Sequence, residues 1–289
     1  MRAPATLLLA CLAAAPARAA GLLEARAQGG EGNLVLGALD FSRPVATGTL
    51  ASVGGTWYSD DSLNATVASL RAGLSRSSEW RTFGLRVLAV PKVEESEAHG
   101  AQASAVFHVR TGDPDYRQST ALNAGWVRHD LKVLPKGAPT WTKRHAVLGQ
   151  GTLEAAFRQS YYGQFHFGMT GAWFYYDRDL TDFRGAHAVL PQTDVAAFGT
   201  LSPLASGLPD WTAGVQYSRP AGDLEDVNFS FGWSRIAFHE RGLWLNSWLA
   251  GLRFEFSDSV SADFGWNGVE GRRGGFRQFF GLHLSTFWK

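Results

Sequence analysis

An alternation of apolar and polar residues, repeated along most of the chain, constrains the fold more than any other feature of the sequence. In a β-strand successive side chains point to opposite faces, so a period of two sends one set of residues to each face. After residue 20 no run of about 18 apolar residues could form a membrane-spanning helix. The sequence therefore predicts an all-β fold. The alternation is clearest in five segments, at 103–109, 165–175, 227–233, 248–256 and 260–266.

The apolar face of such strands is either the core of a water-soluble sandwich or the lipid-facing wall of a membrane barrel. The segments run for about 10–15 residues, which is long for a globular strand and suits a tilted path across a bilayer. Several polar-face positions carry Gly or Ser, where a soluble surface more often carries Lys or Glu: Ser104, Gly168, Gly214, Gly232, Gly251 and Gly265. Trp and Tyr collect at segment ends, as they do at membrane interfaces: Trp57, Tyr58, Trp80, Trp173, Tyr175, Trp211, Trp244, Trp266 and Trp288. These observations favour the membrane barrel.

Backbone hydrogen bonding determines the closure of the wall. Lipid offers the backbone no partners, so every strand must pair on both edges, which predicts a closed antiparallel transmembrane β-barrel. Such barrels have an even number of strands, short periplasmic turns and longer external loops. This rule predicts twelve strands, with 33–41 outside the barrel wall and 185–201 inside a long external loop at 177–209. Counting both segments as spans gives the alternative of fourteen strands. The expected periplasmic turns lie near 75–79, 112–118, 158–162, 219–226 and 257–259.

The first residues have the pattern of a cleaved signal peptide. A positive charge at Arg2 precedes an apolar stretch at 5–15, and Ala17-Arg18-Ala19 gives the small-x-small cleavage pattern. Cys11 is the only cysteine, so the mature chain would have no disulfide, thiolate metal site or catalytic thiol. Cleavage leaves 25 Lys and Arg against 26 Asp and Glu, which argues against a nucleic-acid partner. The expected organisation is a signal peptide at 1–19, a periplasmic or lumen-plugging segment at 20–44, and the barrel at 45–289.

The C-terminal segment 277–289 resembles the last strand of Gram-negative outer-membrane β-barrels, the porin-like superfamily. In that superfamily alternating apolar residues end in an aromatic residue, usually Phe, and the barrel-assembly machinery reads this strand. Here Thr286 interrupts the pattern and Lys289 follows the aromatic residue. The resemblance implies an outer-membrane protein in contact with outer-membrane lipid and lipopolysaccharide. The residues that follow the pattern are Phe280, Leu282, Leu284 and Trp288.

Motifs that carry catalysis are missing from the sequence. There is no Gly-x-Ser-x-Gly elbow, phosphate-binding glycine loop or His-Glu-x-x-His zinc pattern, so we expect no enzyme, cofactor or metal site. His108 or His166 could serve as a base in an outer-membrane lipid hydrolase, but both alternate with the lipid-facing residues and point toward the lumen. A non-conducting barrel that binds a partner through its outer loops, or that is plugged by residues 21–44, is the other alternative.

The polar face predicts the function. Burying ionisable groups away from water would lower the stability of the fold by several kcal/mol for each group. A water-filled lumen removes that cost. Four arginines against two carboxylates suggest a pore or channel for small hydrophilic solutes with some preference for anions. Residues 177–209 would form an external lid or constriction. The candidate lumen-lining residues are Arg86, His108, Arg110, His166, Arg253, Glu255, Asp263, Asn267, Arg277 and His283.

The short connection around Asp258 allows a prediction of strand register. A three-residue loop at 257–259 pairs residues whose numbers sum to 516 and preserves the two faces, whereas a two-residue loop at 257–258 would mix them. Arg253 would then lie opposite Asp263 in the lumen, at a Cβ separation of roughly 4.5–5.5 Å. Because the turn has no glycine, we expect Asp258 or Ser259 to be left-handed.

Overall fold

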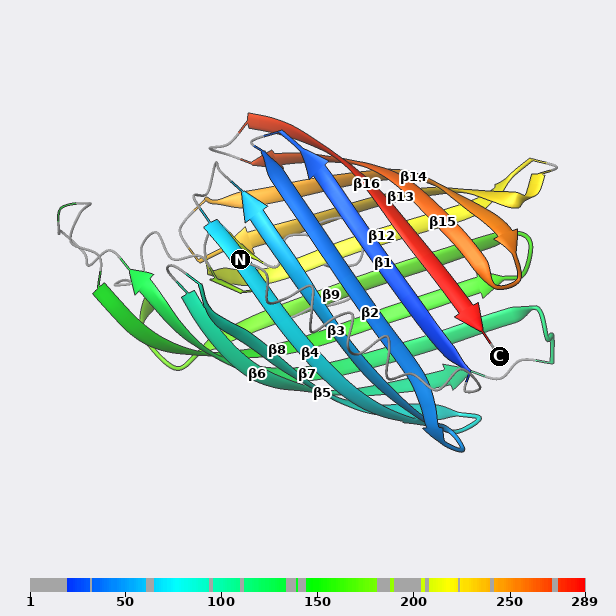
Figure 1. Cartoon of the computed structure of the whole chain (residues 1–289), viewed down its shortest axis with the longest axis horizontal. Coiled ribbons are helices and arrows are strands. Elements are labelled where there is room, and N and C mark those ends of the chain that lie inside the picture. The colour runs from blue at the N-terminus through cyan, green and yellow to red at the C-terminus, as the bar shows by residue number, and fades with distance from the viewer. Residues whose placement is uncertain are drawn as a thin grey trace.

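The computed structural model is a closed antiparallel β-barrel whose strands are inclined to its axis (Figure 1). It describes residues 20–288 except 32, 61–64, 94–95, 110–111, 134–138, 140–143, 181–187, 190–203, 206–207, 223, 240–241 and 272–274. Within these residues, no helix is long and apolar enough to cross a membrane. The wall strands are β1 (Gly21–Gly30), β2 (Leu34–Ala46), β3 (Thr49–Asp60), β4 (Ala65–Ser77), β5 (Arg81–Val93), β6 (Ser96–Val109), β7 (Tyr116–Val133), β8 (Arg144–Tyr161), β9 (Phe165–Tyr176), β12 (Pro209–Ala221), β13 (Leu224–Phe238), β14 (Trp244–Ser257), β15 (Val260–Gly271) and β16 (Gly275–Trp288).

The described wall therefore has fourteen strands, the alternative count, and not the preferred twelve. The two additional strands are β1 and β2, which lie in the wall, so the placement of 20–44 in the periplasm or lumen was wrong. β1 pairs with β16 along its whole length, from Gly21 opposite Trp288 to Gly30 opposite Phe279. The physical reason is backbone pairing, because without β1 and β2 the edges of β3 and β16 would lack partners in lipid.

The connections differ between the two ends of the barrel. One end, here called the turn end, carries both ends of the barrel chain and the connections 47–48, 78–80, 110–115, 162–164, 222–223 and 258–259. The other, here called the loop end, carries the two longest connections, 134–143 and 177–208. The turn end is at the right in Figure 1. From residue 49 onward the connections therefore lie at the predicted ends of the barrel, although the one between β5 and β6 is shorter than the long connection expected near 91–100.

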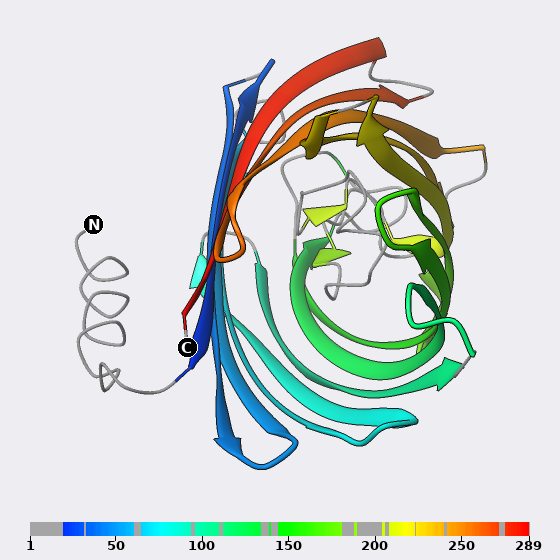
Figure 2. The same ribbon diagram turned by 90° about the vertical axis from the view of Figure 1, so that its right-hand side faces the viewer.

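The connection between β9 and β12 adds no strand to the described wall, because β9 pairs directly with β12. Its described strands β10 (Ala188–Val189) and β11 (Leu204–Ala205) form a separate two-stranded sheet. Seen down the barrel in Figure 2, this small sheet lies inside the ring of wall strands. Most of 185–201, which we expected not to span the membrane, falls outside the described residues.

Large apolar side chains cover the outer face of the barrel. Phe231, Leu85 and Phe280 are each about 60% exposed, whereas the residues beside them along each strand point inward. Most of the predicted interface aromatics share this exposure, including Trp57, Trp80 and Trp173. Tyr58 is a correction, because it points inward and is only 1% exposed. It follows Trp57 directly, and the period of two sends neighbours to opposite faces.

The inner face toward the loop end carries buried apolar side chains next to buried polar ones such as His129 and Gln150. Three apolar clusters line it, and the second includes Leu180 and Leu208 from the connection between β9 and β12. Among the described residues, the inner wall is therefore more closely packed at the loop end. The clusters are Leu36, Tyr58, Val90, Ala98, Val127 and Phe279; Leu131, Val133, Leu148, Leu180 and Leu208; and Ala172, Phe174, Ile236 and Phe238.

The β14–β15 hairpin has the predicted register. Arg253 lies opposite Asp263, Phe254 opposite Ala262, and Leu252 opposite Phe264. The turn itself differs from the prediction, because Ser257 pairs with Val260 and the strand is irregular between Glu255 and Ser257. A bulge thus supplies the extra residue that a three-residue loop would have provided. Asp258 and Ser259 accordingly have negative φ, since Asn33 is the sole non-glycine with positive φ among the described residues.

Candidate functional site: the inner wall of the barrel

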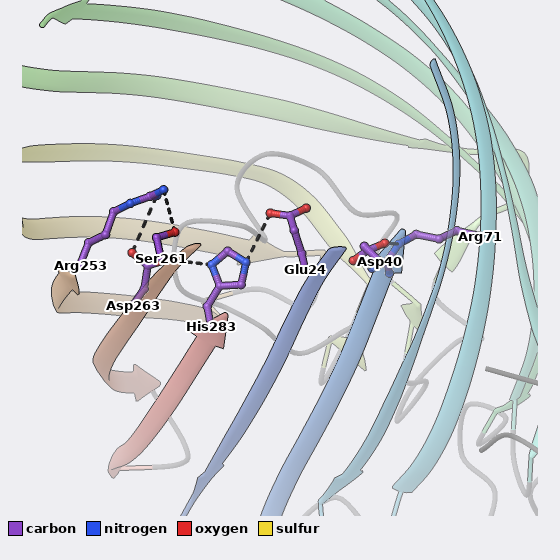
Figure 3. A network of polar contacts seen from close by, with 7 residues as sticks. All are labelled: Glu24, Asp40, Arg71, Arg253, Ser261, Asp263 and His283. Atoms are coloured by element: carbon purple, nitrogen blue, oxygen red, sulfur yellow. Dashed lines mark hydrogen bonds and ion pairs between the residues drawn. The ribbon is translucent and has the colours of Figure 1, made fainter. Parts of the chain in front are cut away.

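A band of charged side chains crosses the place where the barrel closes (Figure 3). Its members come from β14, β15, β16, β1, β2 and β4, so it spans the seam between the first and last strands. Register explains the band, because Arg253 lies opposite Asp263, Asp263 opposite His283, and Glu24 opposite Asp40. We call this set the seam network: Glu24, Asp40, Arg71, Arg253, Ser261, Asp263 and His283.

The strongest contact of the seam network joins β2 to β4 across β3. Arg71 Nε donates to Asp40 Oδ1 at 2.7 Å, and Nη2 donates to Oδ2, which makes the pair bidentate. Arg71 Nη1 also donates to Thr56 Oγ1 at 2.9 Å. Gly54 makes this crossing possible, since a Cβ there would lie 2.0 Å from Asp40 Oδ1. Side-chain hydrogen bonds therefore connect β2, β3 and β4 beside Gly54.

His283 connects the two sides of the seam. Its Nδ1 lies 2.9 Å from Asp263 Oδ2 on β15, and its Nε2 lies 3.3 Å from Glu24 Oε1 on β1. The second contact is an ion pair by distance only, because Nε2 has no hydrogen bond of good geometry. A protonated His283 would join both carboxylates, so the seam combines backbone pairing with a charge bridge.

Arg253 interacts with two carboxylates and a hydroxyl. Its Nε lies 3.4 Å from Glu255 Oε1, its Nη1 lies 3.9 Å from Asp263 Oδ1, and its Nη2 donates to Ser261 Oγ at 3.1 Å. All the charged groups here are 31–49% exposed, so solvent screens the two ion pairs. The predicted pairing of Arg253 with Asp263 is present, and its long distance is that of a weak contact.

The remaining predicted residues are more dispersed. His108 lies 3.4 Å from Thr82 Oγ1, and buried Asn267 accepts a hydrogen bond from Ser247 at 2.7 Å. Arg277 donates to the carbonyl of Glu31 at 2.7 Å. His166 lies on the inner face of β9, near enough to Arg253 and Glu255 for their charges to act on it, and Arg110 falls outside the described residues. The structure thus brings Arg253, Glu255, Asp263 and His283 together, places His166 near the first two, and leaves the others apart; their contact with solutes stays a prediction.

Sequence reasoning missed several charged residues of the inner wall. Glu24 and Asp40 were missed because their strands were placed outside the wall. The sequence contains a pattern that could have identified the first of these strands, because Glu24, Arg26 and Gln28 alternate with Leu23, Ala25 and Ala27. Glu154 is a third such carboxylate, which is 3% exposed and accepts hydrogen bonds from Asn123 and Thr170. Inner-face arginines were missed as well, namely Arg26 on β1 and Arg71 on β4, so the missed residues carry both signs of charge.

Arg86 has fewer polar contacts than several arginines of this wall. In the part of the chain that the structure describes, Arg71 and Arg253 are ion-paired and Arg277 is hydrogen-bonded, whereas Arg86 and Arg26 have neither kind of contact. Its inner-face neighbours are uncharged, with Gly73 opposite it on β4 and Gln102 on β6. Ser52 and Ser104 lie beside the glycines of the same patch, Gly73 and Gly84. Arg86 is thus an unpaired cation in a patch of glycine and hydroxyl side chains.

Among the described residues, no group of His, Cys, Asp and Glu is arranged to hold a metal ion. No protein-family model matches the chain, and no curated protein matches its sequence. The fold does match solved structures. CymD, described as a monoaromatic hydrocarbon channel, superposes with a TM-score of 0.54 at 12% identity, over 93% of this chain and 88% of that one. A bacterial polysaccharide outer membrane secretin gives a TM-score of 0.48 at 11% identity, over 95% of this chain and all of the other.

The apolar outer face and the closed ring agree with the likeness to CymD. The chain has the fold of an outer-membrane β-barrel.

Proposed function

We propose that this protein is a channel of the bacterial outer membrane that passes small hydrophilic solutes and favours anions among them. The closed barrel provides the path, and the charged and hydroxyl side chains of its inner face are compatible with water. The apolar outer face is compatible with lipid. The loop end, where the three apolar clusters and the β10–β11 sheet lie, would be the constriction that limits solute size.

Arg86 is the observation that supports the preference for anions. A guanidinium that is already paired with a carboxylate has little charge left for a solute, whereas an unpaired one attracts anions and offers them several N–H donors. The residues opposite Arg86 on β4 and β6 are uncharged, so neither competes with an anionic solute for its guanidinium. In this proposal Arg86 is therefore the main selectivity-determining residue of the polar half of the lumen.

The test is the zero-current potential of the protein in a planar bilayer between two KCl concentrations. The potential of the wild-type protein should show a preference for chloride, and R86Q should weaken that preference. R86E should shift the potential toward a preference for potassium, because rings of charged side chains set the ion selectivity of a pore. R81Q is the matched control, because Arg81 is on the same strand but lies over the outer-face ring of Phe83, 5.5 Å from its centroid. Unchanged selectivity in R86E contradicts the role of Arg86.

The two alternative functions predict different experimental results. A folded barrel that shows no conductance under any condition would favour the non-conducting, partner-binding barrel. Release of fatty acids from outer-membrane lipid would favour a lipid hydrolase, although the histidines on the inner face lie away from acyl chains.

A further inference from the structure

Two rows of side chains cross the inner wall at the seam, and strand register aligns each row. In the row nearer the turn end, from β14 to β2, every charged member is a carboxylate, and we call it the acidic row. The next row lies two positions nearer the loop end and has an arginine at each end, and we call it the mixed row. The acidic row is Glu255, Ser261, Ser285, Glu24 and Asp40, and the mixed row is Arg253, Asp263, His283 and Arg26.

Arginines hold the carboxylates at both ends of the acidic row. Arg71 lies beyond Asp40 in the same register and binds it in the bidentate pair described above. At the other end, Glu255 lies 3.4 Å from Arg253. These charges therefore already have partners of opposite sign. The middle of the two rows, on β1, is different.

Glu24 and Arg26 lie two positions apart on the inner face of β1 but form no ion pair with each other. One oxygen of Glu24 lies 3.3 Å from His283 Nε2, without good hydrogen-bond geometry, and the Glu24 side chain is 30% exposed (Figure 3). Arg26 is near enough for its charge to act on Glu24. Within the described residues, however, its side chain has no ion pair or hydrogen bond, and its Nε is shielded from water without a partner. β1 thus offers a cation and a carboxylate that do not neutralise each other.

Arg26 differs from Arg86 in its surroundings. The cross-strand neighbours of Arg86 are uncharged, so Arg86 can attract a simple anion. Arg26 lies beside the acidic row, whose carboxylates repel a simple anion as it approaches. A solute that carries both charges gains from each row, because its cationic end can face the carboxylates while its anionic end faces Arg26. The two rows therefore favour a zwitterion over an ion of either sign.

The wall beside the mixed row has room for such a solute. A methyl group built on Gly265 would meet no atom nearer than 3.8 Å outside its chain neighbours, and one on Gly281 none nearer than 3.4 Å. Both glycines belong to a third row, adjacent to the mixed row on its loop-end side. The side chains of this stretch of wall therefore take no space from the lumen. The third row on β14, β15 and β16 is Gly251, Gly265 and Gly281.

We propose that the seam binds short zwitterionic peptides, with the peptide carboxylate at Arg26 and the peptide ammonium at Glu24. Two positions along a strand span about 7 Å at roughly 3.3 Å per residue. An extended dipeptide separates its terminal charges by a similar length, because each residue adds at most about 3.6 Å, whereas the charges of a single amino acid are closer together. The inference rests on the proposed channel, since it names one class among the small hydrophilic solutes.

The experiment titrates dialanine into the full-length protein in micelles of an uncharged detergent and follows binding by saturation-transfer NMR. Three blocked peptides are compared with it: N-acetyl-dialanine, dialanine amide and the doubly blocked form. The wild-type protein should bind dialanine about three to five times more tightly than either singly blocked form, because a partly exposed charge pair contributes up to about 1 kcal/mol, which is about fivefold in affinity.

Variants assign each charge of the peptide to its residue. R26Q should bind dialanine no better than the wild type binds dialanine amide, and E24Q no better than the wild type binds N-acetyl-dialanine. E24Q/R26Q should bind all four peptides alike. R219Q is the matched control and should resemble the wild type, because Arg219 lies opposite Phe229 on the outer face. R26K should retain binding that R26Q loses, and heat-modifiable gel migration checks that each variant is folded.

Equal binding of dialanine and its doubly blocked form by the wild-type protein would overturn the inference. Unchanged dialanine binding in E24Q/R26Q would overturn the site, and equal binding of dialanine and N-acetyl-dialanine would overturn the role of Glu24. Because the titration needs no conduction, the two proposals can fail separately. A protein that conducts KCl but does not prefer dialanine contradicts this inference alone, whereas one that prefers dialanine but never conducts contradicts the channel.

Discussion

The two halves of the inner wall have opposite characters. Toward the turn end the inner face carries Arg253, Glu255 and Asp263, which are each about a third to a half exposed. Toward the loop end it carries apolar side chains such as Leu148 and Val90, which are 0–1% exposed. The same alternation of residues therefore produces a hydrated wall in one half and a packed core in the other. In the proposed channel, the hydrated half would select solutes by charge and the packed half would limit their size.

The largest effect on the free energy of unfolding should come from a substitution in the packed half. L148A removes a fully buried side chain of the second apolar cluster and should lower the free energy of unfolding by about 2–5 kcal/mol, since the cavity it leaves can relax only in part. Q216A, on the partly exposed inner face of β12, should change it by less than about 0.5 kcal/mol. Urea unfolding followed by tryptophan fluorescence measures both. Equal tolerance at the two positions would remove the distinction between the halves.

The second largest effect on the free energy of unfolding should come from Arg71 in the seam network. R71M leaves Asp40 without its bidentate partner and should cost about 3 kcal/mol, the lower end for buried pairs, because Asp40 keeps 27% of its side chain exposed. The double variant R71M/D40L should recover most of the loss, because two well-packed apolar residues can replace a buried pair. The same urea titration tests this. A double variant no more stable than R71M would argue that the pair is not the source of the stability.

Substitutions in the hydrated half should change the free energy of unfolding least. H283Q removes the bridge between Asp263 and Glu24, and we expect a loss of about 0–1 kcal/mol, since all three side chains are 24–31% exposed. The loss should shrink in high salt, because exposed ion pairs are screened. A loss comparable to that of R71M would show that the seam depends on this histidine more than its exposure implies.

The sequence predicted the fold best where outer-face residues are large. In the β14–β15 hairpin Phe254, Leu252 and Phe264 mark the outer face, so the register could be derived to the residue. β1 was missed because its outer-face positions Ala25 and Ala27 are too small to mark a face, whereas 33–41 in β2 was recognised as a possible span and excluded by the rule of short and long connections. Charged residues on those strands were missed with them.

Other features depend on contacts that no local pattern contains. The Asp40–Arg71 pair needs β2 and β4 to meet over Gly54, and these residues are 31 positions apart in sequence. The inward packing of Tyr58 and Leu148 also depends on distant strands, so their burial could not be read from alternation alone. By contrast, Arg253, Asp263 and His283 were found because each lies on a clearly alternating segment.

One pair of adjacent residues tests the account of a hydrated path through the barrel most directly. Ser230 and Phe229 lie on opposite faces of β13, and Phe229 is 43% exposed on the outer face. In a background without Cys11, S230C and F229C are each treated with a charged, membrane-impermeant thiol reagent while conductance is recorded in a planar bilayer. We predict that the reagent modifies S230C and reduces its conductance, whereas F229C stays unmodified in lipid. Modification of F229C but not S230C, or modification of S230C without any change in current, would contradict the account.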